Sequence, residues 1–415
     1  MKNKEIIVGN VSKINSETMV GGNLFKEIKY LDTGNITKNK IDKFQTIKIG
    51  EQNLPNRAQR KVSNSTIIYS TVRPLQEHYG FLDCPPQNLI VSTGFTTLNV
   101  HDDSIDPKFL YYCLTQKNIT NYLNGIASSN VSSYPSINPE DLANLKFIIP
   151  SDVNVQRRLA KVLSTIDSKI FLNEAINTKL LKIAKTFFEY WFVQYDFPNS
   201  QGRPYKANGG EMVWSEVLKK NIPKGWSVLS IKDMANQSTE TISPYNYTDR
   251  KFKHYSIPGF DETGTYIIER GSKIKSDKFI VSEKDILVSK LNPSFNRVIY
   301  STNHKDLICS TEFVIWRAKD FAIKNYLYMI AIDQSFKKFC TQSATGTSNS
   351  HKRINPEMMM DYQVASNLEL IKKFGYTLNE TLRLCAKNEI QNTYLKGLRN
   401  WLHPIIVNGE IKVTF

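Results

Sequence analysis

The tripeptide Ile-Asn-Pro at residues 137–139 occurs again at residues 354–356, 217 positions further along this chain of 415 residues. A second echo lies upstream, where Leu-Ile-Val-Ser-Thr at 89–93 corresponds to Leu-Ile-Cys-Ser-Thr at 307–311. Each copy runs into a long segment with a helical pattern. Self-similarity at a spacing of about half the chain length indicates a duplicated structural unit. We therefore expect a pseudo-twofold internal repeat with two similar but non-identical binding surfaces.

Short β-type runs and turn signals alternate with helical segments in both copies. The β-branched run at residues 65–72 ends before Pro74, as strands do. We expect strands at 65–72, 89–91 and 147–150 and a helix at 107–114 in the first copy, and strands at 285–288 and 306–309 and a helix at 326–332 in the second. The order of elements predicts two mixed α/β globules of ordinary domain size.

A long helix is expected after each globule, at residues 153–192 and 368–402, the second stopping at His403-Pro404. Their apolar residues follow the 4-3 spacing of a coiled-coil seam. Four asparagines occupy seam positions: Asn173, Asn177, Asn388 and Asn392. We expect the two helices to pair antiparallel with these asparagines at the centre of the coiled coil. The alternative is that the seam rotates locally and leaves them in solvent.

Six segments follow from these patterns. They are a first globule at 1–151, a first long helix at 152–192, an ordered linker at 193–225, a second globule at 226–366, a second long helix at 367–403 and a C-terminal tail at 404–415.

The charge balance favours a polyanionic partner. The chain carries 54 Lys and Arg against 39 Asp and Glu, a formal net charge of +15. Such a surplus favours nucleic acid or an anionic membrane surface.

No apolar run approaches the roughly 20 residues of a spanning helix, and the N-terminus lacks a signal-peptide core. The five cysteines are scattered without a CxxC pair, which predicts no metal site and fits a reducing cytoplasm.

The linker contains the most specific motifs in the chain. It reads Asp-Phe-Pro-Asn at 196–199, Pro-Tyr-Lys at 204–206, Gly-Gly-Glu-Met-Val at 209–213 and Ile-Pro-Lys-Gly-Trp at 222–226. With the doubled globules and long helices, these motifs resemble the specificity (S) subunit of type I restriction–modification systems. Segments 54–60 and 346–354 also resemble its recognition domains.

The resemblance implies a non-catalytic DNA-recognition protein. Its two target-recognition domains would each read one half of a split, asymmetric target in double-stranded DNA, and its spacer helices would set the gap between the halves. Two modification (methyltransferase) subunits would dock on the chain, and restriction (endonuclease/translocase) subunits would join them. The chain itself would hold no cofactor. S-adenosylmethionine would belong to the modification subunits, and ATP and Mg to the restriction subunits.

Basic and amide side chains cluster in both globules. Arginine can grip guanine bidentately, asparagine and glutamine can grip adenine, and lysine and arginine neutralise phosphates. The candidates in the first globule are Asn56, Arg57, Gln59, Arg60, Lys61, Arg73, Ser129, Ser132 and Tyr134. Those in the second are Arg250, Lys251, Lys253, Lys273, Lys275, Lys290, Asn292, Asn296, Arg297, Thr347, Ser348, Lys352 and Arg353. The alternative for each residue is a solvated surface group.

Aromatic residues crowd the end of the first long helix. Phe187, Phe188, Trp191 and Phe192 exceed what a two-helix seam can bury. They are therefore candidates for docking a modification subunit. Packing on the chain's own globules is the equally weighted alternative.

Catalytic motifs are not evident in the sequence. The nearest approach to the Asn/Asp-Pro-Pro-aromatic turn of an amino-methyltransferase is Cys-Pro-Pro-Gln at 84–87, which lacks both the amide or acid and the aromatic. No GxGxxG follows a strand, no phosphate-binding GxxxxGK[ST] occurs, and the six histidines are dispersed. Two alternatives stay open: a single-chain DNA methyltransferase or nuclease with duplicated domains, and a generic DNA-binding coiled-coil protein.

Overall fold

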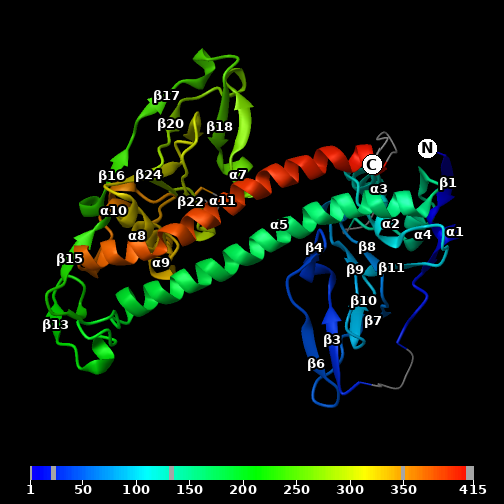
Figure 1. Ribbon diagram of the computed structural model, residues 1–415, viewed down its shortest axis with the longest axis horizontal. Coiled ribbons are helices and arrows are strands. Elements are labelled where there is room, and N and C mark those ends of the chain that lie inside the picture. Colours follow the sequence, from blue (N-terminus) through cyan, green and yellow to red (C-terminus); the bar gives the residue numbers. More distant parts are fainter. Residues whose placement is uncertain (1, 20–24, 130–134, 347–350, 408–415) are drawn as a thin grey trace. The chain divides into compact units, whose positions relative to one another are not determined.

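The protein is described by a computed structural model that covers residues 2–19, 25–129, 135–346 and 351–407 (Figure 1). Contacts within the chain divide it into two compact units, one of residues 1–168 with 395–415 and one of residues 169–394. Two long helices, α5 (Val153–Phe188) and α11 (Leu368–Val407), each contribute residues to both units. Both units mix helices and sheets, so the predicted mixed α/β class is confirmed.

The first unit contains two four-stranded sheets. One has the order β2-β11-β8-β9, formed by Ser12–Ile14, Phe95–Val100, Thr66–Ser70 and Tyr79–Leu82. The other has the order β6-β3-β10-β7, formed by Gln45–Lys48, Glu27–Leu31, Leu89–Ser92 and Ala58–Lys61, with β10 parallel to β3. Two smaller pairs are β1–β12 (Asn3–Ile7 and Lys146–Pro150) and β4–β5 (Ile36–Thr37 and Lys40–Ile41).

Strand β8 lies between two apolar layers of this unit. Ile67 and Tyr69 point into the core shared with the helices, whereas Ile68 points into the core shared with the second sheet. Because alternate residues of a strand face opposite sides, a fully buried strand needs such an unbroken apolar run. The helices are α1 (Val8–Val11), α2 (Pro107–Leu114), α3 (Lys117–Ser129) and α4 (Pro139–Ala143), with the 3₁₀ turns η1 (Thr33–Asn35) and η2 (Pro74–Gln76).

The second unit repeats this plan. One sheet has the order β16-β24-β21-β22, formed by Ala235–Ser238, Phe313–Ala318, Asp285–Ser289 and Val298–Tyr300. The other has the order β17-β20-β23-β18-β19, formed by Thr241–Ile242, Lys278–Ile280, Leu307–Cys309, Lys251–Tyr255 and Ile267–Arg270. Here β23 is parallel to β18, as β10 is to β3. Strands β15 (Ser227–Ser230) and β25 (Gln363–Ser366) pair in the manner of β1 and β12.

Helices cover one face of the β16-β24-β21-β22 sheet, and the second sheet covers the other (Figure 1). Ile286 and Val288 of β21 face the helices, while Leu287 faces the second sheet, which repeats the alternation seen in β8. The helices are α6 (Ile231–Met234), α7 (Ile257–Thr263), α8 (Phe321–Ala331), α9 (Gln334–Ser343) and α10 (Pro356–Met360), with the 3₁₀ turns η5 (Pro244–Asn246), η6 (Gly271–Lys273) and η7 (Pro293–Phe295).

The repeated Ile-Asn-Pro tripeptide starts a short helix in each globule. Pro139 is the first residue of α4 and Pro356 the first of α10, with Asn138 and Asn355 as the capping residues. Proline suits the first helical position because its missing N–H would have no partner there. The isoleucines before the caps, Ile137 and Ile354, are buried. The tripeptide is therefore a helix start anchored in the core.

The long helices differ from the prediction at their ends. Helix α5 ends at Phe188 and passes into a π-helical turn, η3 (Glu189–Val193). Helix α11 does not stop at His403-Pro404 but continues to Val407. Pro404 removes the backbone hydrogen bond to the carbonyl at position 400, which costs about 3 kcal/mol in a helix interior. Burial of Ile406 and Val407 in the core of the first unit offsets this cost and holds the last turn.

The linker is ordered and belongs to the second unit. It contains a 3₁₀ turn, η4 (Lys206–Asn208), and an antiparallel hairpin of β13 (Met212–Ser215) and β14 (Lys220–Pro223). Phe197 stacks between Tyr205 and Trp226, with ring centroids 4.7 and 5.1 Å away. This stacking explains why aromatics recur through a segment rich in Gly and Pro.

Candidate nucleic-acid interface

Backbone hydrogen bonds bring four segments together at one end of the first globule. Thr93 N donates to Arg57 O at 2.8 Å, and Thr71 N donates to Gly94 O at 2.9 Å. Arg73 N donates to Pro135 O at 2.9 Å. We call this region, residues 56–61, 71–77, 93–94 and 135–136, the loop end of the first globule. It gathers candidates that the sequence could not place beside one another.

Most of the first-globule candidates lie at this loop end. Asn56, Arg57, Gln59 and Arg73 are exposed, whereas Arg60 and Lys61 on β7 are half-buried. Burial lowers the pKa of Arg60. Ser129 is the exposed last residue of α3, and Ser132 and Tyr134 lie outside the described residues.

An equivalent loop end exists in the second globule. Lys290 N donates to Glu312 O at 2.9 Å, and Asn292 N donates to Lys352 O at 2.8 Å. The Arg353 guanidinium forms an ion pair with Glu312 at 3.0 Å. We define this loop end as residues 290–297, 310–312, 345–346 and 351–353. It holds the candidates Lys290, Asn292, Asn296, Arg297, Lys352 and Arg353, while Thr347 and Ser348 lie outside the described residues.

Arg297, a candidate for DNA contact from the sequence, has strong partners within the globule. Its guanidinium binds both carboxylate oxygens of Asp261, at 2.6 and 2.8 Å, and also donates to Leu291 O at 3.3 Å. The side chain is only 10% exposed. The hydrogen bond from Arg297 also lowers the pKa of Asp261, which keeps the pair charged. This arginine holds the loop rather than offering its guanidinium to a ligand.

The remaining basic candidates of the second globule lie away from its loop end. Tyr255, the last residue of β18, neighbours the loop end through the hydrogen bond from Ser310 N to Tyr255 O. Lys251 begins the same strand and lies at its opposite end. The distal group consists of Arg250, Lys251, Lys253, Lys273 and Lys275.

Two of these distal residues have partners within the globule. Arg250 Nε donates to Asp306 at 3.0 Å, and Lys253 Nζ lies 3.1 Å from His304 Nδ1. Lys251 and Lys273 line a shallow groove of about 550 Å³ together with Ile268, Glu269 and Arg270. Arg270, the last residue of β19, was not among the candidates from the sequence.

Each loop end carries a short loop with the same unusual backbone. Arg73 and Glu77 flank η2 with φ of 49° and 55°, and Asn292 and Asn296 flank η7 with φ of 47° and 48°. Asparagine tolerates the left-handed region, but for arginine or glutamate it costs about 1–2 kcal/mol. Strain of this kind persists where the surroundings fix the backbone, and it often marks functional loops. The sequence pattern gave no sign of it.

All four seam asparagines are buried between α5 and α11 in the second unit. Asn388 Nδ2 donates to Asn177 Oδ1 at 2.8 Å, and Asn173 Nδ2 donates to Asn392 Oδ1 at 2.8 Å. As the number rises from 173 to 177 on α5, it falls from 392 to 388 on α11, so the helices run antiparallel here. Asn177 Nδ2 and Asn392 Nδ2 also donate to the backbone oxygens of Cys385 and Ile170.

Replacing one of these asparagines is expected to cost more than replacing a pair. In Asn177→Leu, the buried Asn388 amide loses its acceptor, which should lower the free energy of unfolding by about 1–3 kcal/mol. The double variant Asn177→Leu/Asn388→Leu removes both polar groups and should recover most of that loss. Urea denaturation of the two single variants and the double variant measures this coupling, and additive costs would contradict it.

The aromatic cluster at the end of α5 is mostly internal. Phe188 and Phe192 are buried, with Phe192 packing 4.6 Å from Tyr326 and 5.0 Å from Phe374 between ring centroids. Trp191 is partly buried against the same core. The second globule and α11 cover Phe188 and Phe192, which agrees with the alternative that these aromatics pack within the chain. Phe187 is exposed.

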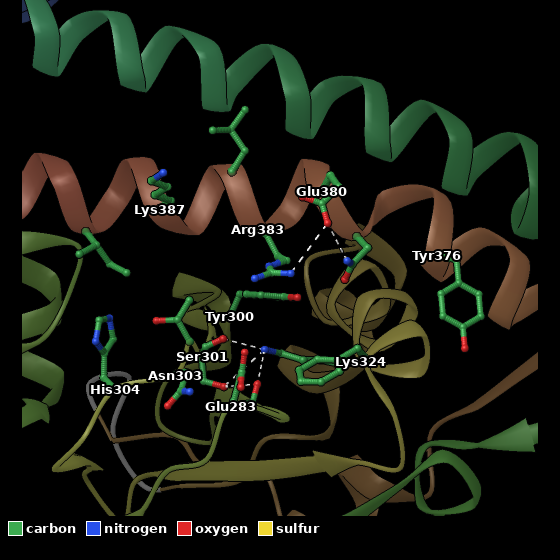
Figure 2. Close-up of a pocket in the computed structure, with 15 residues that line it drawn as sticks. Glu283, Tyr300, Ser301, Asn303, His304, Lys324, Tyr376, Glu380, Arg383 and Lys387 are labelled. Atoms are coloured by element: carbon green, nitrogen blue, oxygen red, sulfur yellow. Dashed lines mark hydrogen bonds and ion pairs between the residues drawn. The ribbon is translucent and has the colours of Figure 1, made fainter.

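A cavity of about 720 Å³ lies between α11 and the second globule (Figure 2). Its wall includes Lys324, whose side chain is buried and lies 3.6 Å from the centroid of the Tyr300 ring. The amine donates to Glu283 O and Ser301 O, both at 2.6 Å, so its hydrogen-bonding capacity is used within the fold. Burial lowers the pKa of Lys324 to about 7, partly offset by the charges of Asp285 and Glu283.

The low pKa of Lys324 predicts a pH-dependent contribution to stability. Between the folded pKa of about 7 and the ordinary value of 10.5, the unfolded chain binds a proton that the folded chain does not, so stability rises with pH. At pH 10, Lys324→Met should be less stable by about 2 kcal/mol, because two buried carbonyl oxygens lose their donor. As the pH falls to 7, the wild-type chain loses more than about 2 kcal/mol by this linkage whereas the variant does not, so the difference should vanish and then reverse. Denaturation at both pH values tests it. A constant difference would contradict the assignment.

Comparison with known proteins places the chain in a family. Residues 4–182 and 223–357 match the family described as type I restriction modification DNA specificity domain, which covers more than half of the chain. The chain therefore belongs to this family. The two matches fall on the two globules, as the internal repeat predicts.

Relatives show the same class. The chain is 30% identical over 193 residues to the type I restriction enzyme HindI specificity subunit of Haemophilus influenzae. The aligned residues make up 46% of this chain and 41% of that subunit. It is 24% identical over 390 residues to the MjaIX specificity subunit of Methanocaldococcus jannaschii, 88% of this chain and 83% of that one. The chain thus spans less than half of the HindI subunit. These relatives are specificity subunits, which confirms the non-catalytic class expected from the sequence.

A solved structure supports the fold. The S subunit of a type I restriction–modification system from M. genitalium aligns with a TM-score of 0.60 at 14% identity, covering 100% of this chain and 97% of that one. Within the described residues, no helix is long and apolar enough to cross a membrane, and no three His, Cys, Asp or Glu side chains group as metal ligands would.

Proposed function

We propose that this chain is the DNA specificity subunit of a type I restriction–modification complex. The globules at 1–151 and 226–366 read the two halves of a split, asymmetric DNA target. The helices at 152–192 and 367–403 set the separation of the halves, with 193–225 as the linker and 404–415 as the tail. The proposal rests on one observation. The DNA specificity family matches the chain twice, once in each globule, and the two globules have the same backbone at their loop ends but different side chains there.

The loop ends have the side chains that DNA recognition needs. Arg57 and Arg73 in the first, and Lys290 and Lys352 in the second, supply positive charge for phosphates. Asn56 and Gln59 in the first loop end, and Asn292 and Asn296 in the second, are amides that can distinguish adenine in the major groove. Because the two sets differ, we expect the two half-targets to differ.

A docking surface for the modification subunit remains on α5 and the turn that follows it. Ile183, Phe187 and Tyr190 are all exposed and lie at i, i+4 and i+7, one face of a helix. We propose that this stripe contacts one modification subunit, and that two such subunits and the restriction subunits complete the complex. S-adenosylmethionine would be held by the modification subunits, and ATP with Mg by the restriction subunits. The chain would then act in the cytoplasm with no cofactor of its own.

Reconstitution tests the proposal. The purified chain and its modification subunits are incubated, separately and together, with genomic DNA and radiolabelled S-adenosylmethionine. Only the mixture should transfer methyl groups to DNA. Methylation or cleavage by the chain alone would instead establish the single-chain enzyme. If the chain binds DNA without sequence preference and the mixture does not methylate DNA, the result would support the alternative of a generic DNA-binding protein.

A further inference from the structure

The tip of the η7 loop presents an aromatic side chain to solvent. Phe295 is 67% exposed, the most exposed large apolar residue in the described part of the chain. Its neighbours in the loop, Ser294 and Asn296, are polar. Single exposed apolar side chains are common on protein surfaces, so a partner for this ring is indicated only by the way the loop holds it.

The backbone that carries Phe295 is fixed from several sides. Phe295 N donates to Asn292 O at 3.0 Å, and Asn296 N donates to Pro293 O at 3.1 Å. Both asparagines are in the left-handed region, and Pro293 between them is buried. Asn292 N donates to Lys352 O at 2.8 Å, and the loop packs against α9. The ring is thus presented by a preorganised loop.

Arg297 packs against one side of the Phe295 ring. Its guanidinium carbon lies 4.8 Å from the centroid of the Phe295 ring. The same guanidinium is held by both oxygens of Asp261, so it cannot follow a phosphate away from the ring. The structure therefore supports one side of Phe295 with a positioned cation, while the ring as a whole remains open to solvent.

The first globule presents an apolar side chain from the same kind of loop. Leu75 is 51% exposed in the loop between Arg73 and Glu77, whose backbone matches that of the η7 loop. Both loops thus expose one apolar side chain, Leu75 at the second position of η2 and Phe295 at the third position of η7. Proteins that deform DNA use such rigid apolar wedges, inserted between neighbouring base pairs.

We propose that Phe295 is a wedge that inserts at one base-pair step in the half-target bound by the second globule, with Arg297 as its positioning residue. In the first globule the position that corresponds to Phe295 is held by Gln76, so the wedge belongs to the second globule. The inference rests on the proposed function and adds a way of reading DNA through deformability. Pyrimidine–purine steps unstack most easily, so the half-target should contain such a step under Phe295.

The test uses the complex of the full chain with its modification subunits, on the target identified by sequencing methylated DNA. 2-Aminopurine is placed at successive positions of the half-target, where unstacking increases its fluorescence. Apart from the adenine that the methyltransferase extrudes, the wild-type complex should show an increase at one step. Phe295→Ala should lose that increase and bind the target at least about 5-fold more weakly, the low end of the effect of losing one stacked base. Phe295→Trp should retain both.

Matched variants separate the wedge from other roles. Tyr376→Ala removes an exposed aromatic of the same unit outside the loop and should leave the fluorescence unchanged. Arg297→Ala should reduce the increase in the wild-type chain but have no further effect in Phe295→Ala, because it acts through that ring. A merely structural arginine would reduce binding in both backgrounds.

The outcomes distinguish the wedge from the proposed function. If the wild-type complex binds no specific target, the proposed function fails and the wedge with it. If the complex binds its target but Phe295→Ala keeps wild-type affinity and fluorescence, the wedge alone is wrong. The variant should melt at the wild-type temperature because the ring is exposed, so a lower melting temperature would show that Phe295 supports the fold instead.

Discussion

Replacing Arg57, Arg73, Lys290 and Lys352 with glutamine is expected to weaken DNA binding by the complex about 10³-fold at 0.15 M salt. Each lost phosphate contact should also reduce the slope of log K against log salt by about 0.9, so the slope should fall by about 3.6 if all four residues contact phosphates. Fluorescence anisotropy with labelled target DNA over a range of salt concentrations measures both quantities.

A matched variant removes the same charge elsewhere. Lys169, Lys179, Lys182 and Lys185 are exposed on α5, and their replacement with glutamine lowers the net charge equally. This control should change the slope by less than one, because only general steering is lost. Equal effects of the two variants would mean that the loop ends do not face DNA. The distal groove at Lys251, Arg270 and Lys273 would then be the next surface to replace.

Gly375→Ala is expected to destabilise the second unit by about 3 kcal/mol, near the upper end of the usual cost of overpacking. A Cβ atom at Gly375 would lie 2.0 Å from Ala322 O, a backbone atom of α8. Asn325 Nδ2 also donates to Gly375 O at 2.9 Å, which holds the two helices at this close approach. Urea denaturation followed by tryptophan fluorescence reports mainly on this unit, because Trp191, Trp214, Trp226 and Trp316 belong to it.

The same substitution on the same helix provides the control. A Cβ atom at Gly397 would meet nothing within 4 Å. Gly397→Ala should therefore leave stability unchanged or raise it by up to about 1 kcal/mol, since alanine favours helix over glycine. Similar losses for the two variants would contradict the close packing of α11 on α8.

Much of the fold was accessible from the sequence because its signals are local. The run 65–72 and Pro107 at a helix start reflect strand and helix chemistry within a few residues, and β8 and α2 formed close to where they were expected. The end of α11 could not be predicted from the sequence. Pro404 is a local stop signal, but burial of Ile406 and Val407, which depends on the tertiary structure, extends the helix beyond it.

The candidate site was less predictable, because it depends on which distant segments meet. Arg57 and Thr71, two residues before Arg73, both hydrogen-bond to the turn at 93–94, a contact that no periodicity reveals. Arg297 read as a base-contacting residue because Asp261, its partner, lies 36 residues away in the sequence. Phe188 and Phe192 read as a docking surface because their cover comes from α8 and α11. In each case the sequence did not show which distant residues would pack against the candidate.

Sequencing of methylated bases in DNA from a methylation-free host that expresses the chain with its modification subunits tests the central claim most directly. The account predicts methylation within one bipartite, asymmetric motif, made of two short sequences separated by a fixed number of unspecified base pairs. Changes at the loop end of one globule should alter only one of the two sequences. A single uninterrupted motif, or changes in both halves from substitutions in one globule, would contradict it.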